Sequence, residues 1–177
     1  MSQPLFQRLL GASVADLPPA LRRAHDADER QVWTGKAQIT ASSNHLARLL
    51  CWVMRLPRPG IDVPVTVTFE RHGEDELWSR DFAGRRYESC LTAREGLMVE
   101  AMGPATNIFR LSVEDGRLHF RLVAFRFLGL SMPGFLCPAC HAVESDVDGR
   151  YHFDVPVSLP GLGTIIRYAG LMEQSEG

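Results

Sequence analysis

From Ile61 onward, apolar and polar residues alternate along the chain, and this two-residue period constrains the fold more than any other feature. Val63, Val65, Val67 and Phe69 share one side of the first such segment, with mostly polar residues between them. Successive side chains of a strand point to opposite faces, so the pattern predicts a strand with one buried face. The pattern recurs and predicts further strands near residues 78–82, 86–92, 97–102, 107–113, 117–122, 142–147, 151–157 and 163–171.

Short connections between these segments favour antiparallel pairing. Glu114-Asp115-Gly116 and Asp148-Gly149 are typical of tight hairpin turns. One more strand, near residues 33–39, precedes the long meander. The fold class is therefore mainly β (α+β): a strongly curved antiparallel sheet that forms a barrel or half-barrel.

Helical periodicity appears only before Ile61. Residues 1–30 are expected to form short helices, with Ser2 as a cap and Pro4 in the first turn. Residues 44–56 predict a helix inserted between the first two strands, with Ser42 or Ser43 as its N-cap. We expect a single domain over residues 1–177, in which the segment 1–30 packs on a sheet domain of residues 31–173.

Composition excludes several classes of protein. Apolar residues make up 45% of the chain and charged residues 23%, as in ordinary globular proteins. The formal net charge of −2 gives no electrostatic footprint for nucleic acid. No export signal and no apolar run long enough to span a bilayer is evident, so a cytoplasmic protein with reduced cysteines is expected. Phosphate-loop, zinc-protease, nucleophile-elbow and dinucleotide motifs are missing, and no cofactor is expected.

The sharpest local motif is Cys137-Pro-Ala-Cys140-His141. Its spacing fits haem attachment, a redox dithiol, or a zinc site completed by His152. Haem attachment needs an oxidising compartment, and a redox dithiol needs a helix N-terminus, which the apolar segment before Cys137 does not predict. A zinc site needs a second close ligand pair, which the sequence lacks. We expect two packed thiols and no metal.

A buried ion pair is a second possibility. By alternation Glu100 lies on the same side as Met98 and Met102, and Arg80 lies between Trp78 and Phe82. If these sides face a cavity, Glu100 could act as a general acid or base, with Arg80 as its counter-charge. The same two residues could instead bind a polar ligand head or form a structural ion pair between strands. Glu144 and Asp154 are further carboxylate candidates.

Two apolar segments have alternative interpretations. The helix at residues 44–56 could be a lid that touches membranes transiently, or a core helix that fills the concave sheet. The segment 127–136 is unusually apolar for a loop. It could be part of the core, or line a pocket or a partner interface.

Motifs spread over most of the chain resemble a bacterial family of domains of unknown function, numbered 4166 in its series. They are Trp78 to Phe82, Gly84 to Ser89, Glu100 to Pro104, Leu128 to Pro133, Glu144, Tyr151 to Val155, Pro160, Gly163, Tyr168 and Gly170. Members of the family occur alone or C-terminal to saccharopine-dehydrogenase-like proteins. The resemblance implies one compact domain, carries no activity with it, and makes a dehydrogenase-like protein a possible partner.

Three hypotheses follow for function. The first is binding of a small hydrophobic or amphipathic, lipid-like ligand in the barrel. The second is a cavity enzyme that uses Glu100 and Arg80. The third is an interaction module that docks its partner through residues 127–136. The expected ligand-binding residues are Trp33, Trp78, Arg80, Phe82, Met98, Glu100, Met102, Phe120, Phe153 and Tyr168.

Overall fold

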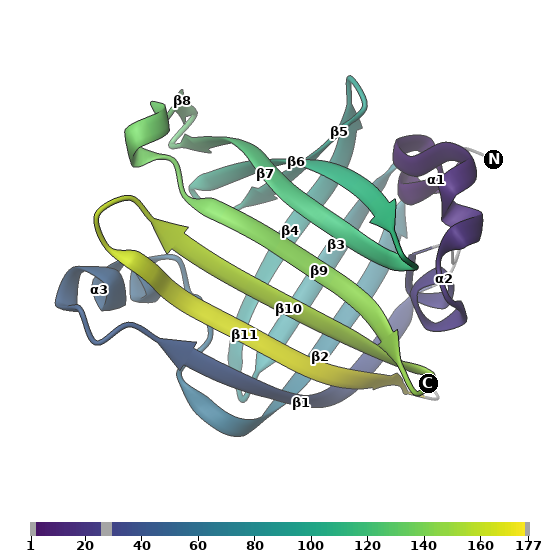
Figure 1. The fold of residues 1–177 in the computed structure, drawn as a ribbon, viewed down its shortest axis with the longest axis horizontal. Helices are drawn as coiled ribbons and strands as arrows, with labels where there is room; N and C mark the ends of the chain where they lie inside the picture. The colour runs from purple at the N-terminus through teal and green to yellow at the C-terminus, as the bar shows by residue number, and fades with distance from the viewer. Residues whose placement is uncertain (1–2, 26–29, 176–177) are drawn as a thin grey trace.

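A computed structural model describes residues 3–25 and 30–175 of the chain. Ten antiparallel strands form a closed barrel, because β6 pairs with β7 and β7 pairs with β9. Each strand pairs with the next strand in the chain, except that β9 pairs with β7 and not with the two-residue β8. The first and last strands, β1 and β11, also pair. The predicted fold class is confirmed, and the barrel alternative is the one that forms (Figure 1).

The strands agree closely with the alternating segments. They are β1 (Gln31–Ala41), β2 (Gly60–His72), β3 (Asp75–Phe82), β4 (Arg85–Arg94), β5 (Leu97–Met102), β6 (Ala105–Glu114), β7 (Arg117–Phe127), β8 (Leu130–Ser131), β9 (Ala139–Val147), β10 (Arg150–Leu159) and β11 (Gly163–Gln174). The largest difference is at β7, which continues five residues beyond the expected end at Leu122, because its last residues pair with β6.

Both expected hairpins form. Asp115 and Gly116 have φ values of 52° and 70°, and Asp148 and Gly149 have values of 55° and 79°. Positive φ at both central residues defines the two-residue turn whose twist matches that of the strands. The chain therefore reverses sharply at these points, and successive strands stay neighbours.

One end of the barrel is covered by the N-terminal segment. It consists of α1 (Leu5–Leu10), the 3-10 helix η1 (Gly11–Asp16) and α2 (Pro19–His25), which lie together at this end in Figure 1. Their apolar side chains Leu5, Phe6, Leu17 and Leu21 are all buried. The expected cap Ser2 and the end of the 1–30 segment at 26–29 lie outside the described residues. Pro4 precedes α1, which has no side-chain cap.

The inserted helix, α3 (His45–Val53), lies at the opposite end (Figure 1). Its N-cap is Asn44, whose Oδ1 accepts hydrogen bonds from the backbone N–H groups of Leu46 and Ala47. The expectation of Ser42 or Ser43 was therefore wrong. The helix buries its small side chains Ala47 and Cys51, while most of its large apolar side chains face solvent. Of the two interpretations of residues 44–56, the core helix that fills the concave sheet is therefore wrong.

The segment 127–136 is also at this end. It contains β8 and the 3-10 helix η2 (Gly134–Leu136), which lie above the open barrel end in Figure 1. Across residues 3–25 and 30–175, no helix is long and apolar enough to cross a membrane.

Candidate functional site

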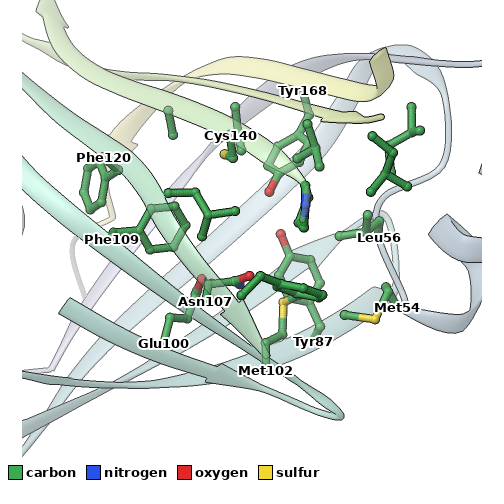
Figure 2. A pocket seen from close by; sticks show the side chains of 18 of the residues that line it. Met54, Leu56, Tyr87, Glu100, Met102, Asn107, Phe109, Phe120, Cys140 and Tyr168 are labelled. Carbon is green, nitrogen blue, oxygen red and sulfur yellow. Dashed lines mark hydrogen bonds between the residues drawn. The ribbon is translucent and has the colours of Figure 1, made fainter. Parts of the chain in front are cut away.

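The barrel encloses a cavity of about 680 Å³. Its lining is mostly aromatic and aliphatic, with a few polar side chains on the walls (Figure 2). The cavity reaches Trp78 and Tyr151 near the end covered by α1. At the other end it is lined by Leu46, Phe135 and Leu136, each more than half exposed to solvent. Because these side chains border both the cavity and the solvent, the cavity opens at this end, called here the mouth.

Nine of the ten expected ligand-binding residues line this cavity. They are Trp78, Arg80, Phe82, Met98, Glu100, Met102, Phe120, Phe153 and Tyr168. Trp33 is not part of the lining. Its ring lies 5.5 Å from that of Tyr151, and its Nε1 donates to Gln31 Oε1 at 3.1 Å, so it is a core residue.

Arg80 and Glu100 meet on the cavity wall. Arg80 Nη2 donates to Glu100 Oε1 at 3.2 Å, and Arg80 Nη1 donates to Ser89 Oγ at 2.7 Å. Asn107 Nδ2 donates to the other carboxylate oxygen, Glu100 Oε2, at 3.1 Å. Each oxygen of Glu100 therefore accepts one hydrogen bond, and the charges of Arg80 and Glu100 compensate each other inside the barrel.

The register of the strands explains this cluster. Glu100 and Asn107 are directly opposite each other in the β5–β6 hairpin, and Arg80 is opposite Tyr87 in the β3–β4 hairpin. Side chains at directly opposite positions lie on the same face and within contact distance.

Aromatic rings support the guanidinium of Arg80. Its Cζ lies 4.9 Å from the ring centroid of Trp78 and 5.4 Å from that of Tyr87, within the range of cation–π attraction. Burial acts to lower the pKa of Arg80, but the Glu100 carboxylate raises it, and the net direction is upward. Arg80 therefore stays protonated inside the cavity.

The hydroxyl of Tyr87 is buried, and among the described residues it makes no hydrogen bond of normal geometry, although the hydroxyl of Tyr168 lies near it. The hydroxyls of Tyr87 and Tyr168 point toward each other inside the cavity (Figure 2). Burial raises the pKa of both phenols, so both keep their protons at neutral pH. A buried hydroxyl without a partner costs free energy, and a polar group of a bound molecule would remove that cost.

A second buried polar group lies near the closed end. His25 Nε2 is 2.6 Å from Glu144 Oε2, and Glu144 borders the cavity. The His25 ring stacks on Phe6 at 4.1 Å and lies 5.6 Å from Trp78. The contacts of His25 with Glu144, Phe6 and Trp78 join α1 and α2 to the barrel wall and form the floor of the cavity.

Neighbouring residues of the cysteine–histidine motif lie on opposite faces of β9. Cys140 lines the cavity, and burial raises the pKa of its thiol to about 12. His141 is exposed, and its Nε2 is 2.9 Å from His119 Nδ1. His152 hydrogen bonds with Ser145 at 3.2 Å. No group of three potential metal ligands occurs within the part of the chain that the structure describes, and Cys140 and His141 face opposite sides of β9.

Asp154 also lies away from the cavity. It forms a two-point ion pair with Arg167, with distances of 2.8 and 2.6 Å. This carboxylate candidate belongs to the outer surface of the barrel.

Sequence reasoning missed Tyr87, Asn107 and His25. The first two could have been found by placing the β3–β4 and β5–β6 hairpins in register, since each lies opposite a residue already singled out. His25 had no such signal, because its contact with Glu144 joins residues 119 positions apart.

Comparison with known proteins gives one match. The family model described as Domain of unknown function (DUF4166) matches residues 17–172. No curated protein and no solved structure matches the chain.

Proposed function

Since the chain belongs to this family of domains of unknown function, whose description assigns no activity, we propose from the geometry that it binds one small amphipathic molecule inside the barrel. The observation that carries the proposal is the mostly apolar cavity of about 680 Å³ with a polar cluster around Arg80 and Glu100 on its wall. Ligand cavities of drug-sized molecules have volumes of roughly 300–1,000 Å³ and a similar balance of apolar lining and few polar groups.

The polar cluster suits a head group without a full charge. Arg80 and Glu100 already balance each other, so an additional ion would lack a counter-charge. The Tyr87 hydroxyl makes no hydrogen bond of normal geometry, so its proton can turn toward a ligand. A ligand hydroxyl, ester or carbonyl oxygen could accept that proton while the hydrocarbon part fills the aromatic region.

The acid–base alternative has less support. A general base must direct one of its oxygens at a substrate proton, and contacts that already hold those oxygens act against this. Both oxygens of Glu100 accept hydrogen bonds from Arg80 or Asn107. We therefore assign Glu100 a positioning role, in which it holds Arg80 and keeps the cluster electrically balanced.

The test is a titration with N-phenyl-1-naphthylamine, an uncharged fluorescent probe of apolar cavities. We expect saturable binding at one site and displacement by 1-dodecanol. Ala142→Phe, which narrows the cavity, should abolish probe binding, whereas the matched substitution Ala101→Phe on the exposed outer face should leave it unchanged. Wild-type protein that binds neither molecule would refute the proposal.

The Tyr87→Phe variant tests the head-group contact separately. Loss of one hydrogen bond should weaken 1-dodecanol binding by roughly 2- to 12-fold. The affinity for N-phenyl-1-naphthylamine should not change, and this comparison is the internal control. Equal affinities of wild type and variant for 1-dodecanol would show that Tyr87 does not contact the head group.

A further inference from the structure

We propose that the mouth of the barrel docks on an anionic membrane surface, from which the ligand enters the cavity. The inference rests on the proposed function, since it assigns the source of the ligand. It is carried by two observations, an exposed apolar surface around the mouth and an uneven distribution of charge between the two barrel ends.

The apolar surface comes from two segments on either side of the mouth. We call it the mouth patch, and each of its side chains is between 47% and 73% exposed. Its members are Leu46, Leu49, Trp52 and Val53 of α3, and Leu128, Leu130, Phe135 and Leu136. Scattered apolar residues are common on surfaces, but a cluster of this kind marks an interaction site.

Charge differs between the ends of the barrel. At the mouth, the connections between strands are residues 42–59, 83–84, 103–104, 128–138 and 160–162, and they contain no Asp or Glu. Arg48, Arg55 and Arg58 lie in the first of them and are exposed. The four two-residue turns at the closed end carry one carboxylate each, at Glu74, Glu95, Asp115 and Asp148. The closed end therefore mixes these acidic residues with the exposed Arg22 and Arg23 of α2, whereas the connections at the mouth contain basic residues without acidic ones.

Carboxylates near the mouth do not cancel this difference. Asp62 and Asp81 lie in β2 and β3, and Asp81 is paired with Arg86 at 2.6 Å. The exposed arginines are thus free to meet lipid phosphates beside the apolar patch. An amphipathic helix with arginines at its flanks is the arrangement that binds the interface of anionic bilayers.

A bilayer fits this surface better than a protein does. The cavity opens in the middle of the mouth patch, since Leu46, Phe135 and Leu136 belong to both. A protein seated on the patch, or a second copy of this chain, would cover the opening. A membrane that contacts the same side chains would hold the ligand directly at the entrance.

The first experiment measures co-sedimentation of the full chain with large vesicles. Binding is expected for vesicles of equal parts phosphatidylcholine and phosphatidylglycerol, decreasing as salt increases, and only weak binding is expected for phosphatidylcholine alone. The variant Leu49→Glu/Trp52→Glu should lose binding. Its control, Val123→Glu/Val147→Glu, adds the same charges at exposed apolar positions outside the patch and should keep it.

The second experiment tests the arginines. The variant Arg48→Gln/Arg55→Gln/Arg58→Gln should bind anionic vesicles more weakly, by about fivefold for each arginine removed. The control Arg94→Gln/Arg110→Gln/Arg117→Gln removes the same charge from exposed positions elsewhere and should bind nearly as wild type does. Equal losses in both variants would overturn the proposal, because attraction would then depend on total charge alone.

The vesicle and probe measurements separate the two proposals. The Leu49→Glu/Trp52→Glu variant should still bind N-phenyl-1-naphthylamine in solution, while Ala142→Phe should still bind vesicles. Wild-type protein that binds the probe but not anionic vesicles would overturn membrane docking and leave the cavity proposal intact. If the wild type sediments as a dimer that the mouth substitutions dissociate, the patch is a contact between copies and membrane docking is likewise overturned.

Discussion

At the scale of single residues, several titratable side chains are buried inside the barrel, and most of them have partners. Arg80 and Glu100 neutralise each other, and Glu144 contacts His25. Glu76 is buried too, and its Oε2 accepts a hydrogen bond from Trp78 Nε1 at 3.0 Å. Burial raises the pKa of Glu76, although His25, Arg71 and Arg8 favour its charged form.

Glu76→Gln should make the protein more stable at neutral pH. Burial raises the pKa of Glu76, although Trp78 and His25 act against it. Because the folded state favours the protonated carboxyl, stability declines as the pH rises from the unfolded pKa, about 4.3, through the raised folded value. The glutamine side chain of the variant stays neutral and can still accept from Trp78, so thermal unfolding at pH 7 should occur a few degrees higher.

The pH dependence provides the control for this prediction. Below about pH 4 both proteins carry a neutral side chain at this position, and their melting temperatures should converge. A variant that is less stable than wild type at pH 7 would mean that the charged form of Glu76 is stabilised in the fold.

At the scale of helices and strands, the alternation of residues predicted which elements form and which side chains share a face. It placed Arg80 and Glu100 on sides that prove to face the same cavity. It could not predict which side of α3 is buried, because periodicity groups side chains without saying what they pack against. The cap of α3 was misplaced for a related reason, since Ser42, Ser43 and Asn44 are all good caps and only geometry selects Asn44.

The pairing of β1 with β11 depends on glycine. A Cβ atom at Gly35 would lie 1.9 Å from the carbonyl oxygen of Leu171 in the neighbouring strand. Gly35→Ala should therefore push the two strands apart and lower the free energy of unfolding by about 3–5 kcal/mol. Gly134→Ala is the matched control, because nothing lies within 4 Å of its Cβ position. Denaturant unfolding should show a change within about 0.5 kcal/mol for this variant; a similarly small change for Gly35→Ala would contradict the close approach.

At the scale of the whole molecule, the barrel is covered at one end by α1 and α2 and open at the other. Sequence predicted the components of this arrangement but not their positions. The contact between His25 and Glu144 and the closure of β1 against β11 both join distant parts of the chain. No local sequence motif predicts either contact. The alternation of apolar and polar residues was therefore equally consistent with a half-barrel.

Access to the cavity should be visible in the labelling of two cysteines. Cys140 lines the cavity and its pKa is about 12, whereas Cys90 is exposed on the barrel surface. Iodoacetamide reacts with thiolates, so at neutral pH it should modify Cys90 well before Cys140. Saturating 1-dodecanol should slow Cys140 further and leave Cys90 unchanged, as measured by peptide mass spectrometry. Equal effects on both residues would indicate general stabilisation of the fold without occupation of the cavity.

The uneven ends of the barrel also determine how the molecule approaches a surface. With a net charge of −2, the protein treated as a point charge would be repelled by an anionic bilayer. The acidic turns and the arginines of residues 42–59 lie at opposite ends of the long barrel axis, and together they contribute a dipole along that axis. In the field of an anionic surface, this dipole experiences a torque that turns the arginines toward the lipid. The opening of the cavity would then already face the bilayer before any side chain touches it.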